Sequence, residues 1–235
     1  MAGRVAPRAA IFDLDGTLAD TFAHLADCFA TALATRLGRR LAPAEVYATF
    51  GPGAGTEVAI LAAFAGGPHP DVVERFFECY ELEHAQRVRL FPGIAELLCI
   101  ARERGVRLGV LTGKGRRATE ITLRALGVLH LLDVVVSGEE APRPKPDPRG
   151  LLLALSRLDA TPAEAIFVGD STADVGAGRA AGVATVLARW NGESPELRAA
   201  AGLCPDHVAD HVSELYPLLG LTLASGRPSG GMGYG

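Results

Sequence analysis

The stretch Ala9-Ala-Ile-Phe-Asp-Leu-Asp-Gly-Thr-Leu-Ala-Asp20 decides the fold that this chain is expected to adopt. Four apolar residues stop abruptly at an acidic turn, which is typical of a buried β-strand whose carboxyl end meets a polar loop. A single buried strand cannot stand alone. Its neighbours in a sheet must therefore come from elsewhere in the chain.

After Phe91-Pro-Gly93, short apolar runs alternate with amphipathic segments. The runs predict strands over 106–111, 133–137, 165–168 and 183–188, and the segments predict helices over 94–104, 116–126, 148–158 and 173–181. Continuously apolar strands that alternate with helices indicate a parallel sheet covered on both faces. The predicted fold class is α/β, a Rossmann-like parallel sheet with helices on both faces that also contains the first strand.

Residues 21–89 show helical periodicity, with predicted helices over 20–37, 43–50, 56–65 and 71–87. Because no convincing strand interrupts this block, we expect an all-helical cap domain (21–89) inserted into a core domain made of 1–20 and 90–224. The glycine- and serine-rich residues 225–235 predict a flexible tail.

The chain has 235 residues, of which 49% are hydrophobic and 21% are charged, as in a globular protein. Its net charge of -4 provides no basic field for a nucleic acid or an anionic membrane. No apolar run approaches the ~20 residues that span a bilayer, and the N-terminus lacks the apolar segment of a signal peptide. We therefore expect a cytoplasmic protein without nucleic-acid or membrane partners. The sequence leaves the oligomeric state open.

Polar residues and glycines follow the first four of the five predicted strands, at the edge of the sheet where ligands bind in this class of fold. They are Asp13, Asp15, Gly16 and Thr17 after the first strand, Thr112, Gly113 and Lys114 after the second, Lys145 after the third, and Asp170, Ser171 and Asp174 after the fourth. Each has an ordinary explanation alone, since Asp and Thr often cap helices or form turns. Clustered carboxylates, however, repel one another unless something positive binds among them.

The chain contains two lysines, Lys114 and Lys145, against twenty-one arginines. A lysine retained in such a chain points to a place that suits a compact ammonium rather than a forked guanidinium. Pro144 and Pro146 flank Lys145 and restrict the backbone on both sides, which favours an aimed side chain. For Lys114, a functional contact and a solvated position in the first helical turn remain equal alternatives.

Together these segments resemble the haloacid dehalogenase superfamily, and within it the phosphoglycolate-phosphatase-like branch with a helical cap. The motifs that carry the resemblance are Asp13-Leu-Asp-Gly-Thr-Leu-Ala-Asp20, Leu111-Thr-Gly-Lys114, Lys145-Pro-Asp-Pro148 and Val168-Gly-Asp-Ser-Thr-Ala-Asp174. The resemblance implies a phosphatase that depends on Mg²⁺ and hydrolyses a small phosphorylated metabolite, similar to phosphoglycolate or a sugar phosphate. The implied intermediate is an aspartyl phosphate.

The resemblance also assigns catalytic and phosphate-binding roles. Asp13 is the expected nucleophile, and Asp15 is the expected general acid and base. Thr112, Gly113 and Lys145 are expected to bind the phosphoryl group, with Lys145 also compensating the charge of Asp13.

The resemblance further implies a magnesium site. Its expected ligands are the carboxylates of Asp13 and Asp170 and the backbone carbonyl of Asp15, with Asp174 orienting the water shell of the ion. Four positions are expected to support the site: Gly16, which permits a tight turn, Asp20, which braces the loop by hydrogen bonds, and Thr17 and Ser171.

Several alternatives remain open. A mutase of the β-phosphoglucomutase type would use the same core but return the phosphoryl group to a sugar. A non-enzymatic binding domain would be expected to lack one of Asp13, Asp15, Lys145 or Asp170, all of which are present. Asp15 argues against a dehalogenase, since the departure of halide requires no acid. The absence of lysine from 21–89 argues against a phosphonatase, which needs a cap lysine.

Two weaker patterns lie outside the motifs. Gly51-Pro-Gly53 is either a loop that faces the substrate or a plain helix breaker. His207 and His211 have the spacing of two metal ligands on one helical face, but no third ligand accompanies them.

Overall fold

The computed structural model describes residues 6–192 and 195–222, and the tail predicted for 225–235 lies outside them. Within this part of the chain, six strands form a parallel sheet in the order β5-β4-β1-β6-β7-β8. The strands are β1 (Ala9–Phe12), β4 (Arg107–Leu111), β5 (Val134–Val136), β6 (Ala165–Gly169), β7 (Ala184–Ala188) and β8 (His207–Ala209). The α/β fold class predicted from the sequence is confirmed.

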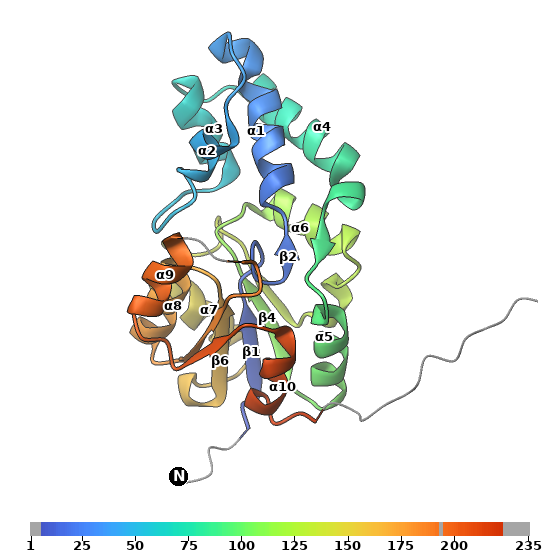
Figure 1. Ribbon diagram of the computed structural model, residues 1–235, viewed down its shortest axis with the longest axis vertical. Helices are drawn as coiled ribbons and strands as arrows, with labels where there is room; N and C mark the ends of the chain where they lie inside the picture. The colour runs from blue at the N-terminus through green and yellow to red at the C-terminus, as the bar shows by residue number, and fades with distance from the viewer. Residues whose placement is uncertain (1–5, 193–194, 223–235) are drawn as a thin grey trace, which may run out of the picture.

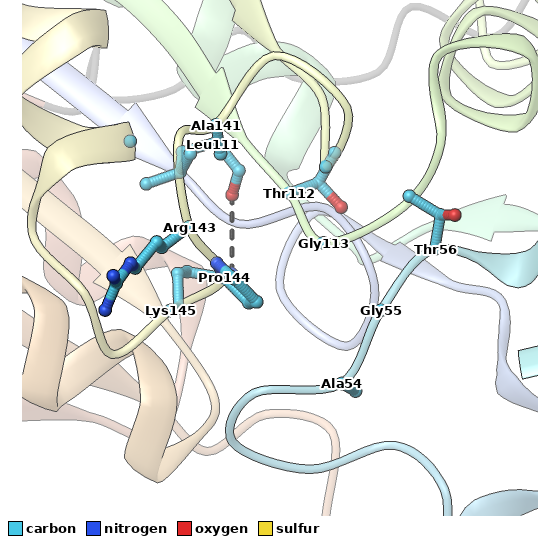
Figure 2. Close-up of a pocket in the computed structure, with 12 residues that line it drawn as sticks. Ala54, Gly55, Thr56, Leu111, Thr112, Gly113, Ala141, Arg143, Pro144 and Lys145 are labelled. Carbon is cyan, nitrogen blue, oxygen red and sulfur yellow. Dashed lines mark hydrogen bonds between the residues drawn. The ribbon is translucent and has the colours of Figure 1, made fainter. Parts of the chain in front are cut away.

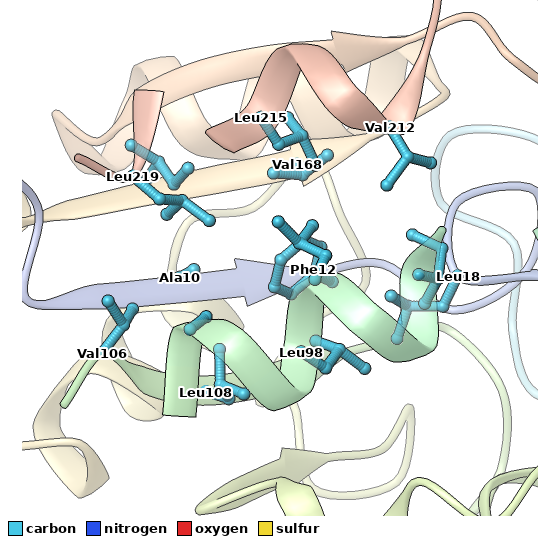
Figure 3. Packing of buried hydrophobic residues seen from close by; sticks show 14 of the residues in the cluster. Ala10, Phe12, Leu18, Leu98, Val106, Leu108, Val168, Val212, Leu215 and Leu219 are labelled. Carbon is cyan, nitrogen blue, oxygen red and sulfur yellow. The ribbon is translucent and has the colours of Figure 1, made fainter. Parts of the chain in front are cut away.

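Helices cover both faces of this sheet because side chains alternate between the faces along each strand. The bounds of these helices are α5 (Ile94–Glu103), α6 (Arg116–Ala125), α7 (Arg149–Arg157), α8 (Thr172–Ala181), α9 (Pro195–Gly202) and α10 (Leu215–Leu218). Ala10 and Phe12 of β1 pack against residues of α5 and α10 on one face (Figure 3), whereas Ala9 and Ile11 pack against α7 on the other. The sheet is therefore buried on both sides.

Four helices lie together beyond the carboxyl end of the sheet (Figure 1). They are α1 (Phe22–Leu37), α2 (Pro43–Tyr47), α3 (Glu57–Ala65) and α4 (Pro70–Arg87). The chain enters and leaves them through a short antiparallel ribbon, β2 (Ala19–Asp20) with β3 (Arg89–Leu90). We call residues 21–89 the cap segment. Its buried apolar residues form a cluster of their own, joined from the rest of the chain by Ala118 of α6.

Among the described residues, no helix combines the length and the apolar character needed to cross a bilayer.

A group of rings is buried in the cap segment beside Tyr80, a residue of α4. The ring of His84 lies 4.4 Å from that of Tyr80 and 5.3 Å from that of His24, measured between centroids. Neither nitrogen of His84 has a hydrogen-bond partner among the described residues. Burial and the nearby ammonium of Lys114 therefore lower the pKa of His84 from 6.5 to about 4.

This buried histidine is expected to make folding stability depend on acid pH. The unfolded chain protonates His84 below about pH 6.5, whereas the folded chain resists protonation until about pH 4, so stability is lost as the pH falls through this window. Between pH 7 and pH 5, urea unfolding should show wild type losing about 2 kcal/mol more than His84→Leu. The exposed His130 provides the control, since His130→Gln should keep the wild-type dependence. Equal losses in wild type and His84→Leu would contradict the expectation.

Candidate functional site

The acidic residues predicted after β1 and β6 lie side by side, because these two strands are neighbours in the sheet. The backbone N–H of Asp13 donates to the carbonyl of Val168 at 2.8 Å, which continues the pairing of the strands up to the site. Asp13, Asp170 and Asp174 each place one carboxylate oxygen within 4.8 Å of the other two. Parallel pairing thus brings together carboxylates that are more than 150 positions apart in the sequence.

Lys145 lies among these carboxylates. Its ammonium donates to Oδ1 of Asp13 at 2.7 Å and to Oδ1 of Asp174 at 2.6 Å. A longer contact of 3.4 Å reaches the carbonyl of Leu111 at the end of β4 (Figure 2, dashed line). Burial lowers the pKa of Lys145, but the charges of Asp13 and Asp174 raise it by more, so the side chain remains charged.

The crowding of the carboxylates is expressed in their pKa values. Burial raises the pKa of Asp13 to about 7, Lys145 opposes this rise, and Asp174 and Asp15 add to it. Burial and the charge of Asp13 raise the pKa of Asp170 well above its usual range. Three carboxyl groups meet here beside a single ammonium, and carboxylate oxygens are the ligands that a hard divalent cation prefers. The donor set fits Mg²⁺.

Gly16 has the backbone conformation that a tight turn requires, as the sequence predicts. Its φ of +81° lies in the region that glycine adopts without strain. A Cβ at this position would also overlap the carboxylate of Asp170. Gly16 therefore allows the loop after β1 to lie directly against the acidic residues that follow β6.

Ser171 and Asp174 form a capping box at the start of α8. The N–H of Asp174 donates to the hydroxyl of Ser171 at 3.2 Å, and the N–H of Ser171 donates to Oδ2 of Asp174 at 3.1 Å. Because Oδ1 of Asp174 accepts from Lys145, the two oxygens have different partners. Helix capping thus fixes Asp174 in the orientation that faces the site.

Thr112 lies buried at the end of β4, and its hydroxyl accepts from the N–H of Lys114 at 3.2 Å. The sequence also allows Thr112 to cap the next helix, but that position belongs to Gly115. The first N–H groups of α6 are bound instead by two carboxylates: Glu57 accepts from Gly115 at 2.8 Å, and Glu139 accepts from Arg116 at 2.7 Å.

A pocket of about 40 Å³ lies between the strand ends and the cap segment, large enough for a few water-sized groups. Thr112, Gly113 and Lys145 line one side, and the segment 54–56 approaches from the other (Figure 2). The N–H of Gly53 donates to the backbone carbonyl of Lys145 at 3.0 Å, which ties the cap segment to the loop that carries this lysine. The Gly51-Pro-Gly53 turn thus reaches the site.

Lys114 is buried, so its interpretation as a solvated residue of the first helical turn is wrong. Its ammonium lies 2.8 Å from Oδ1 of Asp15 and donates to the hydroxyl of Tyr80 at 2.7 Å. Burial lowers the pKa of Lys114, but the charge of Asp15 and the neighbouring Tyr80 and Glu57 raise it by more. Asp15 therefore has a permanent cation beside it.

The bracing role predicted for Asp20 differs from what the structure contains. Asp20 lies exposed in β2, and the described residues give its carboxylate no hydrogen-bond partner. The loop is braced by Thr21, whose hydroxyl donates to Asp15. Thr17 is fully buried, and its carbonyl accepts from the indole N–H of Trp190 at 3.0 Å, whereas its hydroxyl finds no partner among the described residues.

The two histidines spaced for a helical metal site do not share a helix. His207 lies in β8, whereas His211 precedes the short 3₁₀ turn Val212–Glu214. The idea of one helical face is therefore wrong. Within 6–192 and 195–222, the residues that could hold a metal ion together are Asp13, Asp170 and Asp174.

Four residues of the site carry no recognisable signal in the sequence: Thr21, Glu57, Tyr80 and Glu139. Glu57, Tyr80 and Glu139 act through contacts between segments far apart in the chain, such as that of Glu57 with Gly115. Thr21 contacts Asp15, which lies six residues before it. The sequence offers only an indirect clue: lysine is scarce, so Lys114 stands out, and its presence suggests that buried residues contact it.

Known proteins are similar to this chain over most of its length. The family model described as haloacid dehalogenase-like hydrolase matches residues 10–188, which include all four motifs. A phosphoglycolate phosphatase from Nitrosospira multiformis is 36% identical over 183 residues, covering 74% of this chain and 80% of the relative.

Two further proteins are similar over most of the chain. An N-acetylmuramic acid 6-phosphate phosphatase from Pseudomonas aeruginosa is 33% identical over 221 residues, which cover 92% of this chain and 96% of that relative. The crystal structure of CbbY from Rhodobacter sphaeroides in complex with phosphate superposes with a TM-score of 0.74 and 27% identity, covering 92% of this chain and 100% of that one.

Proposed function

The chain belongs to the haloacid dehalogenase-like hydrolase family, and from this premise we propose that it is a phosphatase that hydrolyses a small phosphate monoester through a phosphorylated Asp13. The observation that carries the proposal is the convergence of Asp13, Asp170 and Asp174 around Lys145 at one edge of the sheet. The names of the phosphatase relatives support the same reaction class.

The chemistry follows from the charge of the substrate. A phosphate monoester carries negative oxygens that repel nucleophiles, so catalysis consists mostly of positioning and neutralising charge. Asp13 attacks phosphorus, and the bond to the leaving oxygen breaks as the acyl phosphate forms. Asp15 gives a proton to that oxygen and then takes one from the water that releases phosphate and regenerates Asp13. Lys145, Thr112 and Gly113 bind the phosphoryl oxygens.

Asp13, Asp170 and the backbone carbonyl of Asp15 would hold Mg²⁺, with Asp174 beside its water shell. The bound ion supplies positive charge that allows the nucleophile and the phosphoryl group to approach despite their like charges. Lys145, which contacts Asp13 and Asp174, supplies a second positive charge that helps the nucleophile and the phosphoryl group to approach each other.

The cap segment serves, in this proposal, as a lid domain over the pocket. Its contacts with the core loops, from Gly53 to Lys145 and from Glu57 to Gly115, hold it against the strand ends. Such a lid excludes bulk water and contacts the leaving group, so it is the part of the chain that selects the substrate.

Activity assays can test the proposed function directly. Purified protein should release phosphate from p-nitrophenyl phosphate with Mg²⁺ and stop when EDTA is added. A panel of phosphoglycolate, N-acetylmuramic acid 6-phosphate and sugar phosphates then identifies the preferred leaving group. Interconversion of sugar phosphates without release of phosphate would favour a mutase. Absence of turnover on every ester would favour a binding domain and contradict the proposal.

Magnesium is expected to stabilise the folded protein independently of catalysis, because it relieves repulsion among the three aspartates. At 100 times its dissociation constant, Mg²⁺ should contribute about 2.7 kcal/mol and raise Tm by about 5–10 °C at this chain length. Asp170→Asn should lose most of the shift, whereas Asp159→Asn, at an exposed site, should keep it. A full shift in Asp170→Asn would show that the ion binds elsewhere.

A further inference from the structure

A series of polar contacts, an ion pair followed by hydrogen bonds, leads from the proposed acid and base to the interior of the cap segment. It begins at Oδ1 of Asp15, which lies 2.8 Å from the ammonium of Lys114. The same ammonium donates to the hydroxyl of Tyr80 at 2.7 Å. Tyr80 belongs to α4, and the hydroxyl lies 3.0 Å from that of Thr122 in α6. Lys114 and Tyr80 are both buried, so bulk water cannot replace these contacts.

The direction of each hydrogen bond follows from counting protons. The hydroxyl of Thr122 donates to the carbonyl of Ala118 at 2.9 Å, so its only proton is already used. The hydroxyl of Tyr80 must therefore donate to Thr122, which leaves a lone pair of the phenol oxygen to accept from Lys114. An ammonium can only donate, so its remaining protons point toward acceptors such as Asp15. Burial raises the pKa of Tyr80 to about 12, which keeps the phenol protonated in this role.

The ring of Tyr80 is held in place by its neighbours in the cap segment. It stacks on the rings of His24 and Phe76, at 5.2 and 5.4 Å between centroids, and His84 packs against it at 4.4 Å. Tight packing of this kind leaves a side chain few alternative rotamers. The position of the phenol oxygen is thus set by the apolar core of the cap segment.

At the opposite end of this series of contacts, the carboxyl group of Asp15 is held through one oxygen. The Lys114 ammonium forms an ion pair with Oδ1, and the hydroxyl of Thr21 donates to the same oxygen. Within the described part of the protein, Oδ2 takes part in neither of these contacts and remains the oxygen that can face a leaving group. The ion pair and the hydrogen bond hold Oδ1 and so fix the plane of the carboxyl group, and proton transfer depends on such placement.

We propose that Tyr80 is a positioning residue for Asp15, because it anchors the Lys114 ammonium that orients the Asp15 carboxyl group toward the leaving group. This inference rests on the proposed function, since it requires Asp15 to protonate the leaving oxygen. It gives the cap segment a role in the chemical step in addition to covering the pocket.

Leaving-group dependence tests this role. The p-nitrophenolate ion departs readily without a proton, whereas an alkoxide such as that of a sugar phosphate needs one. For Tyr80→Phe, kcat/KM on the best alkyl phosphate of the panel should fall by about 10- to 100-fold, the scale of a lost buried hydrogen bond to a charged group. On p-nitrophenyl phosphate it should change less than about threefold. Because kcat/KM covers only the steps up to departure of the leaving group, later hydrolysis does not obscure the comparison.

Two further variants complete the test. Lys114→Met should show the same selective loss at greater size, and Thr122→Val a smaller one, provided that each melts cooperatively. Tyr216→Phe changes another buried tyrosine, in α10, and should leave both substrates unaffected. An equal loss on both substrates, or no loss on either, in folded Tyr80→Phe would overturn the positioning role. Failure of the proposed function would be distinguishable, since wild type would then hydrolyse neither ester.

Discussion

Asp13→Asn is expected to lower kcat by on the order of 10⁵-fold, the scale on which an enzyme loses its nucleophile. The amide has nearly the same shape as the carboxyl group but does not attack phosphorus. Lys145 would keep its contact of 2.6 Å with Asp174, so its ammonium is not left unpaired. The fold should therefore survive. Phosphate release under saturating substrate measures the loss, and thermal unfolding verifies the structure.

The control for this variant is Asp71→Asn, which makes the same substitution at an exposed position of α4 and should keep wild-type rates. If folded Asp13→Asn retained kcat within about tenfold of wild type, Asp13 would not be the nucleophile.

Lys145→Arg is expected to lower kcat by about 10²- to 10³-fold although the charge is kept, which is the range for removing one preorganised donor from a developing negative charge. The ammonium fits between Oδ1 of Asp13 and Oδ1 of Asp174, at 2.7 and 2.6 Å. A planar guanidinium is larger and directs its protons in a fixed fork, so it cannot hold both oxygens and a phosphoryl group in the same space. Steady-state kinetics on the preferred substrate measures the effect.

The reverse exchange at the surface serves as the control. Arg124→Lys alters an exposed pair with Glu120 on α6 and should change neither kcat nor stability measurably. Wild-type rates in Lys145→Arg would show that any positive charge suffices at this position and that the site does not require an ammonium.

The sequence predicts the sheet and the order of its main strands well because these depend on local patterns. The apolar run Ala9–Phe12 and the acidic turn after it occur where expected, and so does the alternation of strands and helices through 188. Strands β2, β3 and β8 were not predicted, since runs of two or three residues are too short to show a period. Asp20 was placed at the start of a helix but lies in β2. The same lack of a period allowed His207 to be placed on a helix.

What local patterns cannot predict is which segment covers a given strand end. The position of Lys114 after β4 follows from the sequence, but its burial depends on Tyr80, which lies 34 residues away in α4. Likewise, the acidic side chain of Asp20 and its place in the first motif suggest a residue that braces the loop. The residue that contacts Asp15 is the neighbouring Thr21. Contacts between the cap segment and the core arise from packing, and a single sequence does not encode them in any spacing.

The phosphorylated form of Asp13 can be trapped and identified by mass spectrometry. Enzyme turning over its preferred substrate with Mg²⁺ would be quenched in acid and digested, and its peptides examined by mass spectrometry. We expect one phosphoryl group on the peptide that contains Asp13, absent from Asp13→Asn and removed by borohydride, which reduces acyl phosphates. A phosphoryl group on another residue would contradict the assignment of Asp13 as nucleophile. An unmodified Asp13 peptide would also contradict this assignment, provided that the enzyme had released a burst of alcohol before the quench.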